Sequence, residues 1–153
     1  MSLFRKILVP VDGSRHSLNA VCMAAKIAKV HGGELRIVHV IDELLLGQLA
    51  RFSDKKRESI REELKSTAQA FLFDMRCAAS RELSATCEVL IREGVPHEII
   101  LEEAVNWGAD LIVMGKVGQR GVSRILLGSV AERVIEFSDV PVMVVKQSSF
   151  TGC

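Results

Sequence analysis

The chain has 153 residues, 48% of them hydrophobic, so it fits one ordinary domain that can bury a core without disulfides or metals. Twenty basic and nineteen acidic side chains give a formal charge of +1, which excludes a global field that attracts nucleic acid or an acidic membrane face. The first apolar stretch is too short for a signal peptide, and no apolar run reaches membrane-spanning length. We expect a cytoplasmic protein with one domain over residues 1–148 and a tail over residues 149–153.

The cysteines do not point to a metal or redox centre. All four lie far apart, without a CxxC pair and without a histidine at zinc-finger spacing. No metal site built from protein ligands is therefore predicted. Because the total charge is close to zero, any anion site must be local.

The first part of the chain alternates strand and helix patterns. A β-branched apolar run at Lys6–Val11 predicts a buried strand, and the Asp-Gly-Ser sequence after it predicts a turn and a helix N-cap. Apolar residues at helical spacing predict a helix over Ser17–Val30, and Leu35–Ile41 predicts a second strand. The segment Asp42–Lys56 shows no clear period and is interpreted as an irregular excursion.

The rest of the chain continues the alternation. An apolar stripe from Ile60 to Ala78 predicts a long helix. The elements expected after it are a strand at Ala85–Ile91, an amphipathic helix at Pro96–Trp107, a strand at Asp110–Gly115, a glycine-rich loop, a helix at Ser129–Phe137 and a strand at Val140–Val145.

Strands that are apolar on both faces and alternate with helices are typical of a doubly wound α/β fold. The sheet is then open, five-stranded and parallel, with helices on both faces. In such sheets a ligand binds beyond the carboxyl ends of the strands, where the strand order reverses. Unusual residues follow the first strand at Pro10–Ser14 and the fourth at Met114–Gly115, which predicts that these two strands are neighbours.

The loop from Gly115 to Ser129 has the features of a phosphate site. Glycines at positions 115, 118 and 128 let the backbone approach a ligand, and Ser129 opens a helix whose free N–H groups favour negative charge. Local positive charge comes from Lys116, Arg120, Arg124 and Arg133. The alternative is that the glycines only form turns and that Ser129 and Glu132 form a capping box. Neither GxxxxGK[ST] nor GxGxxG is present.

The spacing G-x2-G-x9-G-[ST] after a D-L-I-V-M strand resembles the ATP-binding branch of the universal stress protein family. The likeness covers nearly the whole chain. It includes four further blocks in the same order: K-I-L-V-P-V-D-G-S from Lys6, H-V-I-D from His39, G-V-P-H-E-I-I from Gly94 and P-V-M-V-V from Pro141.

This resemblance implies a strand order of 3-2-1-4-5 and a role for each matching residue. Asp12, the backbone of Val11 and Val40 would hold the adenine, with Pro10 at the same turn. The adenosine would lie against Met114, Gly115 and Gly118, and the phosphates would bind Gly128, Ser129 and Val130. The implied ligand is ATP, or AMP or another adenine nucleotide, with a divalent cation such as Mg²⁺ on the phosphates and no dedicated protein ligand for it.

Several residues also have simpler interpretations. Lys116 and Val117 stand where the family often has Ser or Thr and then His or Arg, so phosphate contacts at these positions are open. Asp12 is interpreted as a ligand contact, with a turn-stabilising residue as the alternative. His39 is expected to be a core or half-buried histidine, and His16 is expected on a solvated helix face.

The leading hypothesis is a regulatory protein that signals through its nucleotide-bound state, with at most slow hydrolysis, because no general base is evident. The alternatives are a Mg-dependent ATPase or nucleotidyl-transferring enzyme, and an interaction module that binds no nucleotide. A phospho-receiver is disfavoured because only one acidic residue, Asp12, follows the first strand. The apolar edge at Val140–Val145, together with the resemblance, predicts a homodimer through the fifth strand.

Overall fold

The computed structural model describes residues 2–83, 86–116 and 127–146. In chain order its elements are β1 (Lys6–Pro10), α1 (Arg15–His31), β2 (Glu34–Asp42), α2 (Glu43–Arg51), α3 (Arg57–Glu82), β3 (Cys87–Gly94), α4 (Pro96–Trp107), β4 (Leu111–Gly115), α5 (Ser129–Phe137) and β5 (Val142–Val145). The five strands form one parallel sheet with the order β3-β2-β1-β4-β5. The predicted fold class and strand order are confirmed.

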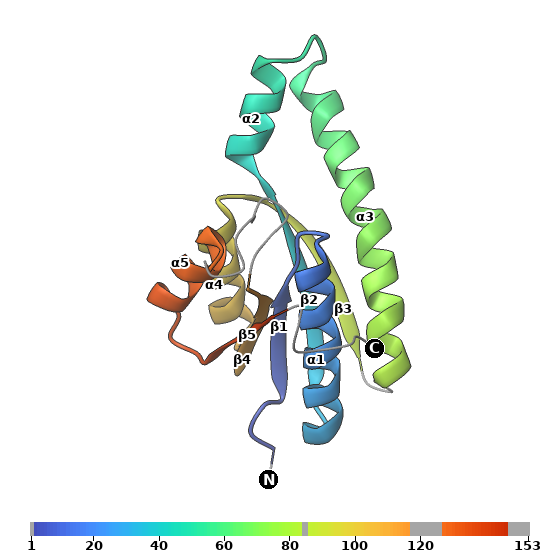
Figure 1. The fold of residues 1–153 in the computed structure, drawn as a ribbon, viewed down its shortest axis with the longest axis vertical. Helices are drawn as coiled ribbons and strands as arrows, with labels where there is room; N and C mark the ends of the chain where they lie inside the picture. The colour runs from blue at the N-terminus through green and yellow to red at the C-terminus, as the bar shows by residue number, and fades with distance from the viewer. Residues whose placement is uncertain (1, 84–85, 117–126, 147–153) are drawn as a thin grey trace.

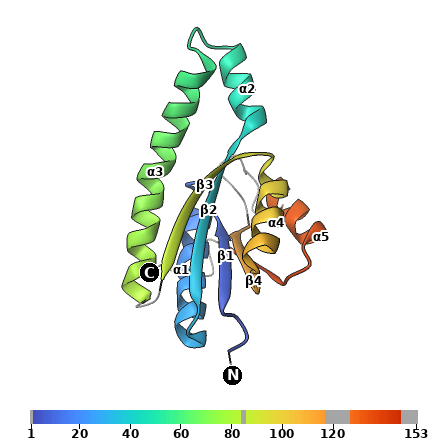
Figure 2. The ribbon, with the colours of Figure 1, turned by 180° about the vertical axis from the view of Figure 1, so that it is seen from behind.

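Helices cover both faces of the sheet, as Figures 1 and 2 show from opposite sides. Helices α1 and α3 pack on one face, and α4 and α5 pack on the other. Successive residues of β1 serve the two layers alternately: Ile7 and Val9 belong to the first core and Leu8 to the second. All three side chains are fully buried, which explains why the strand is apolar on both faces.

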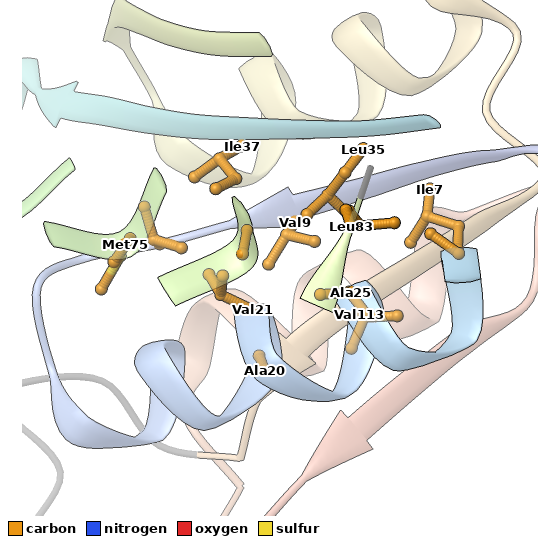
Figure 3. Packing of buried hydrophobic residues seen from close by; sticks show 14 of the residues in the cluster. Ile7, Val9, Ala20, Val21, Ala25, Leu35, Ile37, Met75, Leu83 and Val113 are labelled. Carbon is orange, nitrogen blue, oxygen red and sulfur yellow. The ribbon is translucent and has the colours of Figure 1, made fainter. Parts of the chain in front are cut away.

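The larger core lies between the sheet and the pair α1 and α3. In Figure 3, Ile7 and Val9 of β1 and Val113 of β4 meet small side chains of α1 such as Ala25. Small residues on α1 let this helix lie close to the sheet. Each fully buried large aliphatic side chain contributes roughly 1.5–3 kcal/mol relative to exposure, so this layer stabilises the scaffold that carries the carboxyl ends of the strands.

The segment after β2 corrects the sequence interpretation, because most of Asp42–Lys56 forms helix α2. The Asp42 carboxylate accepts a hydrogen bond from the Leu44 N–H at 2.9 Å and caps α2. Within α2 only Leu46 is buried, whereas Leu44 is 68% exposed. The helix has only nine residues, and its three consecutive leucines at positions 44–46 mask the helical spacing, which is why its period was missed. Together α2 and the start of α3 form an arm beyond the carboxyl ends of the strands (Figure 1).

The register confirms that the first and fourth strands are neighbours. Leu8 of β1 pairs with Ile112 of β4, and Pro10 pairs with Val38 of β2 on the other side. β1 is therefore the strand from which the connections diverge in both directions. Among the residues that the structure describes, no helix is long and apolar enough to cross a membrane.

Candidate functional site at the carboxyl ends of the strands

The structure brings most of the predicted site residues together at the carboxyl ends of the strands. They follow or end three adjacent strands, or begin α5: Pro10, Val11 and Asp12 at β1, Val40 in β2, Met114 and Gly115 at β4, and Gly128, Ser129 and Val130 at α5. Gly118 lies outside the described residues. Val40 and Met114 are 8% and 5% exposed and also pack in the second core, so their apolar side chains have a structural role.

The turn after β1 is held by its own hydrogen bonds. The Ser14 N–H donates to Asp12 Oδ1 at 2.9 Å, and Ser14 Oγ accepts from the Ser17 N–H at 3.2 Å as the N-cap of α1. Gly13 has a φ of +83°, which favours glycine at this position. Asp12 thus has the turn role. A carboxylate has about four lone-pair sites, so this role is compatible with a ligand contact.

Val11 is fixed on both sides by β2. Its N–H donates to the Val38 carbonyl at 2.9 Å, and its carbonyl accepts from His39 Nδ1 at 2.7 Å. The acceptor is a carbonyl, so the Nδ1 atom of His39 must carry the proton. Because both polar backbone groups of Val11 are engaged inside the protein, hydrogen bonding from Val11 to an adenine would need a second lone pair on its carbonyl.

His39 is half-buried, as expected, but it is also a donor to the backbone of the site. Its ring meets Phe71 of α3 edge-on, with 5.0 Å between ring centroids. Burial lowers the pKa of His39, while the hydrogen bond to Val11 and the negative charge of Asp12 act in the opposite direction. The sequence interpretation missed this donor role. The available signal was a polar ring next to Val40 within the otherwise apolar run Ile37–Ile41.

Gly115 allows α1 to lie against the end of β4. A Cβ atom at this position would lie 2.7 Å from His16 Cβ and 2.8 Å from the His16 carbonyl carbon. The expected solvated position of His16 is wrong: the residue is half-buried, and its Nδ1 atom is buried with no hydrogen-bond partner among the described residues. The absence of a side chain at Gly115 is therefore required by packing, whatever else this glycine contacts.

Both ends of the glycine-rich loop are tied together at Lys116. The Lys116 N–H donates to the Val145 carbonyl at 3.0 Å, and the Lys116 carbonyl accepts from the Gly128 N–H at 2.8 Å. The second bond brings the start of α5 next to the end of β4. It also occupies the Gly128 N–H, so this group is not available as a phosphate donor.

Helix α5 begins without a side-chain cap. Its N-cap is Gly128, whose carbonyl accepts from the Glu132 N–H at 2.9 Å, and the capping box between Ser129 and Glu132, given above as the alternative, is not formed. The first-turn N–H groups of Ser129, Val130 and Ala131 lie before the start of the helical hydrogen-bond pattern. The sequence analysis did not include Ala131, although its position in the first turn of this helix was readable.

The chain matches the family model described as "Universal stress protein family" over residues 3–146. Universal stress protein MJ0531 of Methanocaldococcus jannaschii is 41% identical over 146 residues, which cover 95% of this chain and 84% of that relative. A solved structure of protein MJ0577 superposes with a TM-score of 0.82 at 30% identity, covering 94% of this chain and 96% of that one. Another, a universal stress protein in complex with cAMP, has a TM-score of 0.70 at 27% identity, covering 95% and 99%. This chain belongs to the universal stress protein family.

Proposed function

We propose that this protein binds an adenine nucleotide, ATP or AMP, across the carboxyl ends of β2, β1 and β4, and that it acts through its nucleotide-bound state. The observation that carries the proposal is that the Asp12 carboxylate, the Val40 backbone and the uncapped start of α5 converge at the carboxyl ends of the strands. A family member solved with cAMP supports an adenine ligand. Hydrolysis is at most slow.

The base would be recognised by one acceptor and one donor of the protein. Adenine offers an exocyclic amino donor beside a ring-nitrogen acceptor. Asp12 presents a carboxylate acceptor after β1, and Val40 presents a backbone N–H from the neighbouring β2. Guanine has the opposite donor and acceptor order on that edge, so this pair favours adenine.

The phosphates would bind the first turn of α5 through the N–H groups of Ser129, Val130 and Ala131. A helix N-terminus carries about half a positive charge, which favours this arrangement. Among the described residues, no group of three or more His, Cys, Asp or Glu side chains is placed to hold a metal. Mg²⁺ usually binds substrate phosphates and water rather than a protein cage, so a divalent cation on the nucleotide fits this site.

We also propose a homodimer through β5. This strand lies at an edge of the sheet, and α5 packs beside it. Met143 of β5 and Ile135 and Phe137 of α5 are 36%, 45% and 54% exposed. Pairing of two β5 edges would cover this apolar surface. Light scattering should give twice the 16.8 kDa chain mass, and a species of 16.8 kDa alone would contradict the dimer.

The nucleotide proposal is tested by calorimetric titration of ATP, GTP, adenosine and tripolyphosphate. We expect GTP to bind at least about tenfold more weakly than ATP, since one mismatched hydrogen bond is worth about 1–3 kcal/mol. Asp12→Ala should weaken the binding of ATP and of adenosine by a similar factor and leave the affinity for tripolyphosphate unchanged. Asp54→Ala, at an exposed position between α2 and α3, is the matched control. Equal affinities for ATP and GTP would contradict the base site, and rapid multiple turnovers would favour the enzyme alternative.

A further inference from the structure

The hydrogen-bond direction along β2 alternates between its two neighbours. The Leu35 N–H donates to Thr86 beside β3, whereas the Val38 carbonyl accepts from Val11 on the β1 side. Backbone groups two residues apart in a strand face the same neighbour. The N–H of Val40 therefore faces the β1 side, as the groups of Val38 do.

In a continuing parallel ladder, the next bond after Val11 N–H to Val38 would run from the Val40 N–H to the Val11 carbonyl. In the described structure this bond is not formed, and the paired register of the two strands ends at Pro10 and Val38. The Val11 carbonyl instead accepts from His39 Nδ1 at 2.7 Å. The side chain of β2 has replaced the backbone of β2 as the donor.

The geometry points to His39 as a positioning residue that ends the β1–β2 ladder one bond early and reserves the Val40 N–H for the nucleotide base. The inference rests on the proposed function. Val40 is 8% exposed, and more than about 90% of buried backbone N–H groups in proteins are paired, so a donor left at this edge needs an acceptor from a ligand or water. A ring nitrogen of adenine is such an acceptor.

The surroundings of His39 hold the ring in the required position. Phe71 of α3 contacts it edge-on, with planes at 90°, and Ile91 is its register partner on β3. Asp12, in the turn after β1, is the charged group whose field acts on the ring. With an apolar residue at position 39, the Val11 carbonyl would accept a hydrogen bond from the Val40 N–H. The β1–β2 ladder would then continue by one bond, and this N–H would not be available to the base.

Amide hydrogen exchange measured by NMR without nucleotide tests the ladder directly. In the wild-type protein we expect the Val40 amide to exchange at least about tenfold faster than the Val38 amide, and to become protected when ATP is added. In His39→Leu the Val40 amide should be protected without ligand. His97→Leu, in the first turn of α4, is the control. Equal protection of Val40 in the wild-type and His39→Leu proteins would overturn the inference.

Two further variants separate positioning from a general packing role. His39→Asn places an amide donor near the Nδ1 position and should restore both the fast exchange of Val40 and the affinity for adenosine. His39→Gln places its amide near Nε2 instead, so it should behave like His39→Leu even if the apolar variant does not fold.

Affinities for the two halves of the nucleotide complete the test. His39→Leu and His39→Gln should weaken adenosine by about fivefold to tenfold, as expected for one lost hydrogen bond, and leave tripolyphosphate unchanged. A loss shared by both ligands, or no rescue by His39→Asn, would show a merely structural role. If the wild-type protein binds neither ATP nor adenosine, the proposed function is wrong, and the exchange rates of Val40 still decide whether His39 ends the ladder.

Discussion

The amino and carboxyl ends of the strands use their polar groups differently. At the amino ends, the Asp110 carboxylate accepts from the backbone N–H groups of Arg5 and Lys6 at 3.0 and 2.9 Å. The Lys6 ammonium donates to the Trp107 carbonyl at 3.2 Å. At the carboxyl ends, within the part of the chain that the structure describes, the first turn of α5 has no side-chain cap and the Val40 N–H makes no bond to the Val11 carbonyl.

Side chains of the sheet show the same difference between the amino and carboxyl ends of the strands. Arg36, near the start of β2, donates to Glu88 and Glu103 at 2.8 and 2.9 Å and lies 4.5 Å from the centroid of the Trp107 ring. Polar groups at this end satisfy one another and stabilise the fold. At the other end, backbone donors are held in place without partners among the described residues, which is the arrangement that a ligand site requires.

Removing Arg36 should give the largest change in stability. Arg36 and Glu103 are 17% and 12% exposed, so Arg36→Leu leaves a mostly buried carboxylate with Arg92 at 3.6 Å as its remaining partner. We expect a loss of about 3 kcal/mol in urea unfolding and no change in ATP affinity. Lys55→Ala, which breaks an exposed pair with Glu63, should cost less than about 1 kcal/mol. A loss of ATP affinity in Arg36→Leu would show that the two ends are coupled.

Gly115→Ala should have the second largest effect on stability, because it acts at the boundary between scaffold and site. The added Cβ would meet the backbone of His16 within 3 Å, and backbone cannot move as easily as the end of a side chain. We expect a loss of about 1–3 kcal/mol, measured by urea unfolding, and weaker ATP binding as α1 shifts. In the control Gly47→Ala, the nearest atom would be the end of Arg57 at 3.7 Å, so stability should be unchanged or higher. Unchanged stability in Gly115→Ala would show that the end of β4 is not tightly packed.

Replacing the serines at the starts of α1 and α5 should change the free energy of unfolding by smaller amounts, and these amounts should differ. Ser14 caps α1 through its hydroxyl group, so Ser14→Ala should lower the free energy of unfolding by about 1 kcal/mol. Ser129 makes no cap bond on α5, so Ser129→Ala should change it by less than about 0.5 kcal/mol. Thermal unfolding of both variants checks this difference. Equal losses would mean that the hydroxyl group of Ser129 does cap its helix.

The dependence of stability on pH should be the smallest effect. The native pKa of His39 lies below its ordinary value of 6.5 because burial disfavours the charged ring. Above pH 6.5 the ring is neutral in both the folded and the unfolded state. The neutral, buried ring then makes its full contribution to the free energy of unfolding. As the pH falls from 6.5 towards the native pKa, the unfolded state binds the proton first and stability is lost. Urea unfolding between pH 8 and 5 should show a smaller loss in His39→Asn, and an identical loss would exclude His39 as the cause.

The sequence predicted most elements because their patterns are local. Strands that are apolar on both faces, such as Lys6–Pro10, and the turn and N-cap at Ser14 were recognisable without any tertiary contact. Helix α2 was not, because it has only nine residues, three of them consecutive leucines, which do not reveal a helical period.

For the site, the sequence by itself predicted which segments would carry ligand chemistry: the turn at Asp12, the end of β4 and the start of α5. Only the tertiary structure decided which backbone groups are available there. The Val11 carbonyl is taken by His39 and the Gly128 N–H by Lys116, through bonds between segments that are distant in the chain. Hydrogen bonds of this kind depend on strand register and strand order, which no local pattern of residues encodes.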